Sequence, residues 1–227
     1  MKRLLSFHIV IFSFFTFPSI ISAGIISDNF NGYSAPQLPV TSMGDWRIFD
    51  GAVDLVGDGT GHEYYPTLGQ GYYIDLVGTG DTPGILWSPS LFLEVGEHDI
   101  DISYKLGNNQ FNSILPDEVA VVITLRAALF GDPGALPSDP SLVIDAWTHS
   151  VAPIQPFTTY QNSTTIETNF DAYLHFGFYL DSPTVSSIGP LLDDVNIQSS
   201  VIPAPGAILL SSFGVVIVGC FRRRRTL

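Results

Sequence analysis

The chain has 227 residues and a formal net charge of −13, and its charges are unevenly distributed. All 22 acidic residues lie between Asp28 and Asp194, where only Arg47, Lys105 and Arg126 are basic, so this middle part carries a net charge of −19. A surface this negative repels nucleic-acid phosphates, which excludes nucleic acid as a partner. The single cysteine, Cys220, lies outside the middle part, which therefore forms no disulfide and no thiolate metal site.

The N-terminus has the order of features found in a secretory signal peptide. Residues 1–3 are basic at Lys2 and Arg3, and residues 4–17 form an apolar run without a charged side chain that Pro18 ends. Small residues precede a cleavage site between Ala23 and Gly24. The run is shorter than the roughly 20 apolar residues of a membrane-spanning helix. We therefore expect residues 1–23 to be a signal helix that is removed.

The middle of the chain, residues 24–200, alternates between apolar and polar side chains over short stretches. Residues 98–106 place Ile100, Ile102, Tyr104 and Leu106 on one face, and residues 172–180 do the same with Leu174, Phe176, Phe178 and Leu180. This period of two predicts half-buried β-strands. The more continuously apolar runs 119–125 and 142–147 predict core strands.

Glycine, aspartate and proline clusters separate these strands, and residues 132–140 form one long predicted loop. No stretch has a long apolar period of 3.6 with helix caps. About ten short strands in one cysteine-free domain predict an all-β fold, a two-sheet antiparallel sandwich of the jelly-roll type.

The C-terminal residues 201–227 have a different character. Pro203, Ala204 and Pro205 interrupt regular structure and Gly206 opens an uncharged, mostly apolar segment, 206–221. Four basic residues close it: Arg222, Arg223, Arg224 and Arg225. As a transmembrane helix this segment would be about 24 Å long. The arginines can compensate for that short length by reaching the interface, and they place the large domain on the far side of the membrane.

This tail resembles the PEP-CTERM sorting signal, a family of tails also called the ice-binding-protein C-terminal domain. Ala204 stands where that signal usually has glutamate, in a Pro-Ala-Pro-Gly variant. The resemblance implies export across the inner membrane, transient anchoring, and cleavage by an exosortase near the tripeptide, followed by transfer to the cell surface or an extracellular matrix. An ordinary C-terminal membrane anchor is the alternative. Ice binding is not expected, because Thr158, Thr159, Thr164 and Thr165 are too few and too local.

Two short pieces of the middle part are similar to carbohydrate-binding-module-like jelly rolls: residues 28–31 and residues 189–197. The second contains Asp193 and Asp194 in a Leu-Asp-Asp-Val context, similar to the closing strand of those modules. The likeness implies a structural calcium ion held by Asp28 with Asp193 or Asp194, since first and last strands are often neighbours and calcium prefers carboxylate oxygens. The alternative is that these are carboxylates facing solvent.

The sequence contains few other residues that could form a functional site. Exposed aromatic side chains bind glycans, and Tyr64 and Tyr65, in a turn-rich stretch, are the best candidates, although most aromatic residues are expected in the core.

Serine-hydrolase, zinc-protease and phosphate-loop motifs are absent from the sequence, and the histidines outside the signal are widely separated. We therefore expect no enzyme and no catalytic residue, with a secreted glycan-active enzyme as the least favoured reading. The sequence favours a structural or adhesive role, with a calcium-stabilised carbohydrate-binding module that contacts extracellular polysaccharide as the alternative.

Overall fold

The computed structural model describes residues 24–57, 71–79, 82–109, 115–128, 142–181 and 189–202. Within them the chain forms strands and no α-helix, so the all-β expectation is confirmed. No helix among these residues is long and apolar enough to cross a membrane. The predicted signal helix, the transmembrane segment 206–221 and the loop 132–140 lie outside the described residues.

Eight short strands come first, followed by six long ones. The short strands are β1 (Ile25–Asp28), β2 (Gln37–Val40), β3 (Ser42–Met43), β4 (Trp46–Phe49), β5 (Val53–Gly57), β6 (Tyr72–Asp75), β7 (Ile85–Trp87) and β8 (Leu91–Leu93). The long strands are β9 (Gly96–Asn109), β10 (Asp117–Ala127), β11 (Leu142–Val151), β12 (Ile154–Thr168), β13 (Ala172–Leu180) and β14 (Leu191–Ile202). The sequence predicted about ten short strands. These six strands are longer than predicted, because apolar alternation marks only the buried part of a long strand.

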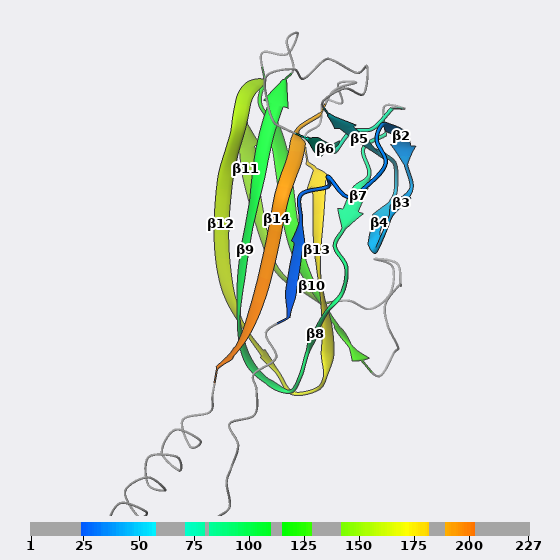
Figure 1. Ribbon diagram of the computed structural model, residues 1–227. Coiled ribbons are helices and arrows are strands. Elements are labelled where there is room, and N and C mark those ends of the chain that lie inside the picture. Colours follow the sequence, from blue (N-terminus) through cyan, green and yellow to red (C-terminus); the bar gives the residue numbers. More distant parts are fainter. Residues whose placement is uncertain are drawn as a thin grey trace, which may run out of the picture.

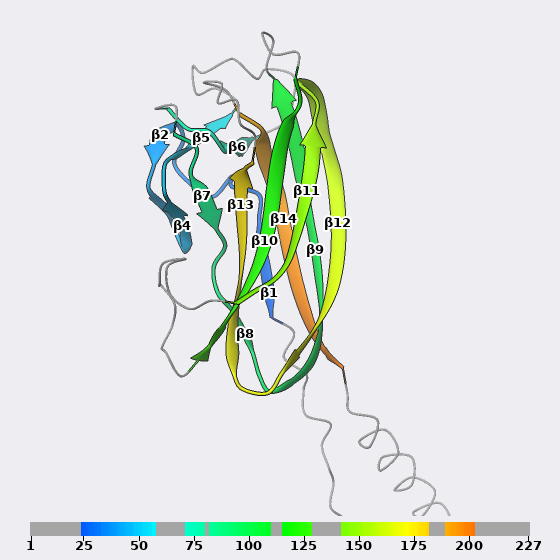
Figure 2. The same ribbon diagram turned by 180° about the vertical axis from the view of Figure 1, so that it is seen from behind.

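These strands form two antiparallel sheets that pack face to face. Sheet A has the order β12-β9-β14-β6-β5-β2 with β1 also paired to β14, and it faces the viewer in Figure 1. Sheet B has the order β11-β10-β13-β7-β4-β3 with β8 also paired to β13, and it comes to the front in Figure 2. The expected two-sheet antiparallel sandwich is thus confirmed.

The predicted core faces of two strands are buried as expected. Ile100, Ile102, Tyr104 and Leu106 on β9 belong to the same core cluster as Leu174, Phe176 and Phe178 on β13. The aromatic rings link the sheets, because the ring centre of Phe178 lies 5.3 Å from that of Tyr104 and 6.4 Å from that of Trp46 on β4. A single apolar layer between the sheets therefore holds the sandwich together.

The prediction that residues 142–147 form a core strand is wrong. They begin β11, which among the described strands pairs only with β10 and so forms the edge of sheet B. Leu142 and Val143 are 68% and 59% exposed. Apolar content alone does not distinguish a central strand from an edge strand, whereas the prediction for 119–125 is confirmed because β10 lies between β11 and β13.

We expect Phe178→Ala to lower the free energy of unfolding by about 3–5 kcal/mol, because it leaves a cavity where the two sheets meet. Denaturant unfolding measures this loss. Phe92→Ala is the matched control, because Phe92 is 47% exposed, and it should cost about 1 kcal/mol or less. Equal losses for the two variants would contradict the assignment of the core.

Candidate functional site

The structure brings the three predicted calcium ligands close together. β1 pairs with β14 so that Asp28 lies opposite Val195, next to Asp194. The expectation that the first and last strands are neighbours is therefore confirmed. The register of β14 against β9 shifts between Asp193 and Asn196, and Asp194 in this bulge has a φ of 47°. Aspartate tolerates this left-handed conformation better than most residues, so the sequence suits the bulge.

Protein donors already occupy both carboxylate oxygens of Asp28. Oδ1 accepts a hydrogen bond from the backbone N–H of Phe30 at 2.7 Å. Oδ2 accepts from the Tyr33 hydroxyl at 2.7 Å and from the indole Nε1 of Trp46 at 2.8 Å. Burial and the Asp28 carboxylate together raise the pKa of Tyr33 well above its usual range, which keeps this hydroxyl a donor. Asp28 thus fixes the turn after β1 against the core residue Trp46.

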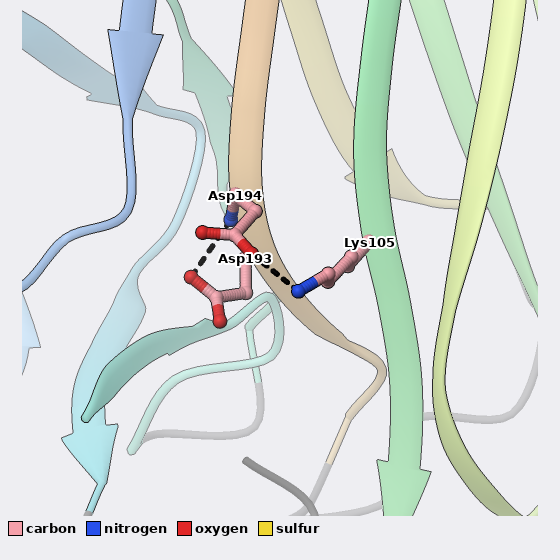
Figure 3. A network of polar contacts seen from close by, with 3 residues as sticks. All are labelled: Lys105, Asp193 and Asp194. Atoms are coloured by element: carbon pink, nitrogen blue, oxygen red, sulfur yellow. Dashed lines mark hydrogen bonds and ion pairs between the residues drawn. The ribbon is translucent and has the colours of Figure 1, made fainter. Parts of the chain in front are cut away.

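Asp193 and Asp194 point in different directions from the bulge (Figure 3). The Asp193 Oδ1 atom accepts a hydrogen bond from the backbone N–H of Asp194 at 2.7 Å, whereas the Asp194 carboxylate forms an ion pair with Lys105 on β9. Burial is the main reason why the pKa of Asp193 rises to about 6, and the carboxylates of Asp194 and Asp28 add to this rise. Sequence reasoning missed Lys105, whose only signal was its position on the polar face of β9.

Protein donors therefore occupy both oxygens of Asp28 and one oxygen each of Asp193 and Asp194. Calcium between them would have to displace the Lys105 ammonium from Asp194 and the donors from Asp28. No group of three or more histidine, cysteine, aspartate or glutamate side chains is arranged to hold a metal ion among the described residues. Calcium at Asp28, Asp193 and Asp194 therefore remains a prediction, and the observed contacts do not fit it.

The outward face of sheet A has two depressions, which together we call the polar trough. One depression of about 250 Å³ is lined by Asp101, Ile102, Ser103, Gln161, Asn162, Asn196 and Gln198. A second, of about 730 Å³, is lined by Ser27, Asp28, Asn29, Gly32, Tyr33, Ser103, Lys105, Thr159, Asp194, Val195 and Asn196. Ser103 and Asn196 line both, so the two depressions adjoin each other. Hydroxyl, carboxamide and carboxylate groups dominate the trough, and such groups bind polar ligands through hydrogen bonds.

The other predicted site residues are only partly described. Gly24 lies just before β1, and its carbonyl oxygen accepts a hydrogen bond from the backbone N–H of Ser199 at 3.0 Å. Outside the described residues lie Ala23, the glycan candidates Tyr64 and Tyr65, and the sorting motif formed by Pro203, Ala204, Pro205, Gly206, Arg222, Arg223, Arg224 and Arg225. Trp46, Trp87 and Tyr73 are buried, as expected for most of the aromatic residues.

The described histidines contact other side chains and backbone groups of the sandwich. The Tyr104 hydroxyl lies 2.5 Å from Nε2 of His149, and burial lowers the pKa of His149. Nε2 of His98 lies 2.8 Å from the carbonyl oxygen of Glu94, and His175 packs edge-on against Trp87. Nδ1 of His98 lies 3.5 Å from the Ser199 hydroxyl.

Comparison with known proteins shows only distant structural similarity. Neither a family model nor a curated protein matches the sequence. The K1 cleaved adhesin domain of Lys-gingipain from Porphyromonas gingivalis is 14% identical, with 76% of this chain and 96% of that one covered and a TM-score of 0.45. The CBM22-1 xylan-binding domain of Xyn10C from Paenibacillus barcinonensis is 13% identical, with 75% and 99% covered and a TM-score of 0.43.

A family 35 carbohydrate-binding module from Clostridium thermocellum is 8% identical, with 72% of this chain and 98% of that one covered and a TM-score of 0.34. All three TM-scores are below 0.5, so these similarities support no conclusion about what this chain binds.

We expect Asp193→Asn to change how stability depends on pH. The folded state raises the pKa of Asp193 from 3.8 to about 6, so between about pH 4 and 6 it keeps a proton that the unfolded chain releases. This contribution to stability is complete below about pH 4 and is lost as the pH rises through 6. The variant should therefore lose less stability than the wild type between pH 4 and 7.

Denaturant unfolding at pH 4, 5, 6 and 7 measures this difference. Asp101→Asn, at an exposed position on the same face, is the matched control and should follow the wild type. Burial also raises the pKa of Asp117 to about 6, so part of the pH dependence of stability remains in every variant. Identical curves for Asp193→Asn and the wild type would contradict the buried state of Asp193.

Proposed function

We propose that this chain is an exported, non-catalytic surface protein whose sandwich has a structural or adhesive role in an extracellular matrix. The pairing of β1 with β14 carries this proposal. Ile25, where β1 begins, lies opposite Gln198, and β14 ends at Ile202. Both ends of the domain therefore lie toward the same end of the sandwich (Figure 1). A domain attached to a membrane at that end leaves its other end and its sheet faces accessible to partners.

We further propose that the sandwich is a jelly roll. The strands β1-β14-β9-β12 of sheet A face β8-β13-β10-β11 of sheet B. Apart from the inserted strands β2 to β7, each connection passes from one sheet to the other except that between β10 and β11. This alternation supports two interleaved Greek keys.

Sorting by an exosortase through residues 201–227 belongs to the same proposal. We expect the protein recovered from its native host to have lost residues 1–23 and the tail beyond about Pro205, and intact-mass measurement tests both losses. A retained tail would make the chain an ordinary membrane-anchored protein and would contradict the exosortase assignment. A retained N-terminus would contradict export through a cleaved signal peptide.

The alternative function is carbohydrate binding, which the polar trough favours. Sugars are bound through hydrogen bonds to carboxamides and carboxylates, and the trough offers these groups on three adjacent strands, at Gln161, Asp101 and Asn196. Tyr33 lines the second depression and provides an aromatic ring at the same surface. Tyr64 and Tyr65 remain the aromatic candidates proposed from the sequence.

We expect the double variant Gln161→Ala with Asn196→Ala to lose retention on the host's own polysaccharide in affinity electrophoresis, if the trough binds glycans. Ser163→Ala is the matched control, because Ser163 is exposed on β12 and does not line the trough. A wild-type protein without retention would contradict carbohydrate binding. Loss of retention on Tyr64→Ala with Tyr65→Ala alone would move the site away from the trough.

A further inference from the structure

The long strand β12 ends sheet A on one side and pairs there with no further strand among those described. Its inner side is hydrogen-bonded to β9, and its outer side forms the left edge of the sandwich in Figure 1. Residues 158–168 keep an uninterrupted register with β9, so the regular edge is about 37 Å long. An edge strand presents a row of unpaired backbone N–H and C=O groups, which is a template for pairing with another chain.

The other three sheet edges are short, irregular or charged. β2, at the opposite edge of sheet A, has four residues and includes Pro39, which cannot donate to a strand ladder. β3, at one edge of sheet B, has two residues. β11, at the other edge, has a shift in register beside Val143 and carries the charged side chain of Asp145. Such devices prevent edge pairing, and residues 158–168 of β12 have only Glu167, close to one end.

β12 is also neutral in a domain that is otherwise strongly acidic. Residues 154–166 contain no charged side chain, although the middle part of the chain carries a net charge of −19. Thr159, Gln161, Ser163 and Thr165 are exposed on the outward face of β12. Two copies of so acidic a domain repel each other, and a neutral edge is where they can approach with least repulsion. Hydroxyl side chains opposite each other on paired strands add hydrogen bonds to the ladder.

We propose that β12 pairs in antiparallel orientation with β12 of a second copy of this chain, so that sheet A continues across a two-fold axis. Pairing of residues 158–168 over their whole length places Ser163 on that axis. Glu167 then lies opposite Thr159 of the second copy, so the two glutamates are kept apart. This register also matches outward-facing residues with outward-facing residues, because side chains alternate along both strands. The segment is therefore complementary to itself, which favours a second copy over an unrelated extended peptide.

This dimer would give a partner to the structural role proposed above, and it rests on that role only for its biological meaning. A two-fold axis makes the same patch serve on both copies, as in most homodimers. The outward faces of both A sheets, with their polar troughs, then lie on one side of a continuous sheet. A monomeric protein would overturn this inference and leave export, sorting and carbohydrate binding to their own tests.

Sedimentation equilibrium of the full chain in a density-matched detergent tests the pairing, at about 1 to 100 µM protein because small polar interfaces are weak. The wild type should approach twice the monomer mass as the concentration rises. Ser163→Glu should weaken this association at least tenfold, because it places two glutamates opposite each other on the axis.

Ser200→Glu is the matched control and should associate as the wild type does. Ser200 is exposed like Ser163. Each of the two serines lies opposite an aspartate of β9, Asp99 for Ser200 and Asp101 for Ser163. Ser200 differs in lying on β14, inside the sheet, where no second copy can pair. The same added charge should therefore act only at the edge.

A charge exchange separates pairing from a defect in folding. An equimolar mixture of Ser163→Glu and Ser163→Lys should recover the association that Ser163→Glu loses, because opposite charges then face each other on the axis. The proposal would be overturned by a monomeric wild type, by full association of Ser163→Glu, by loss of association in Ser200→Glu, or by a mixture that stays monomeric.

If Ser163→Glu fails to fold, oxidative crosslinking replaces it. Opposite residues of antiparallel strands have Cα atoms about 4.5 to 5.5 Å apart, which a disulfide can span. In a Cys220→Ser background, Ser163→Cys should therefore give a disulfide-linked dimer and Ser200→Cys should not. Equal crosslinking of both variants, or of neither, would contradict pairing through β12.

Discussion

The sandwich depends on the packing of aromatic side chains between two sheets that no disulfide joins. The only cysteine of the chain, Cys220, lies in the C-terminal tail. Trp46, Tyr104, Phe176 and Phe178 are each almost completely buried and come from both sheets. The indole of Trp46 also donates to Asp28, so the turn after β1 is tied to the same layer. Loosening this layer would therefore release both the sheets and the edge of the polar trough.

The acidic residues of the domain show how a chain with few basic residues accommodates many carboxylates. Asp28 has hydrogen-bond donors on both oxygens, and Asp194 has the ammonium of Lys105. Asp117 and Asp193 have raised pKa values and become neutral close to pH 6. Each of these ways to stabilise a carboxylate follows from the scarcity of positive side chains, because a single lysine compensates only one carboxylate.

The sequence revealed the features that depend on local periodicity. Residues 98–106 and 172–180 alternate clearly, and their apolar faces are the core of β9 and β13. The edge position of residues 142–147 depends on which strands pair, and pairing is a long-range property that composition does not report. The proximity of Asp28 to Asp194 was predictable. The hydrogen bonds that Asp28 accepts from Tyr33 and Trp46, and the ion pair of Asp194 with Lys105, were not, because they depend on side-chain geometry.

The position of β14 has a consequence for the order of events in synthesis. This strand is the last of the domain in sequence, yet it pairs with β1, β6 and β9 and so occupies the middle of sheet A. A ribosome completes it after all its neighbours, and the apolar segment 206–221 begins only four residues after Ile202. The strand that closes the sheet and this apolar segment are therefore synthesised almost together. A polypeptide interrupted before Leu191 would lack β14, and β1, β6 and β9 would each lose the strand with which they pair.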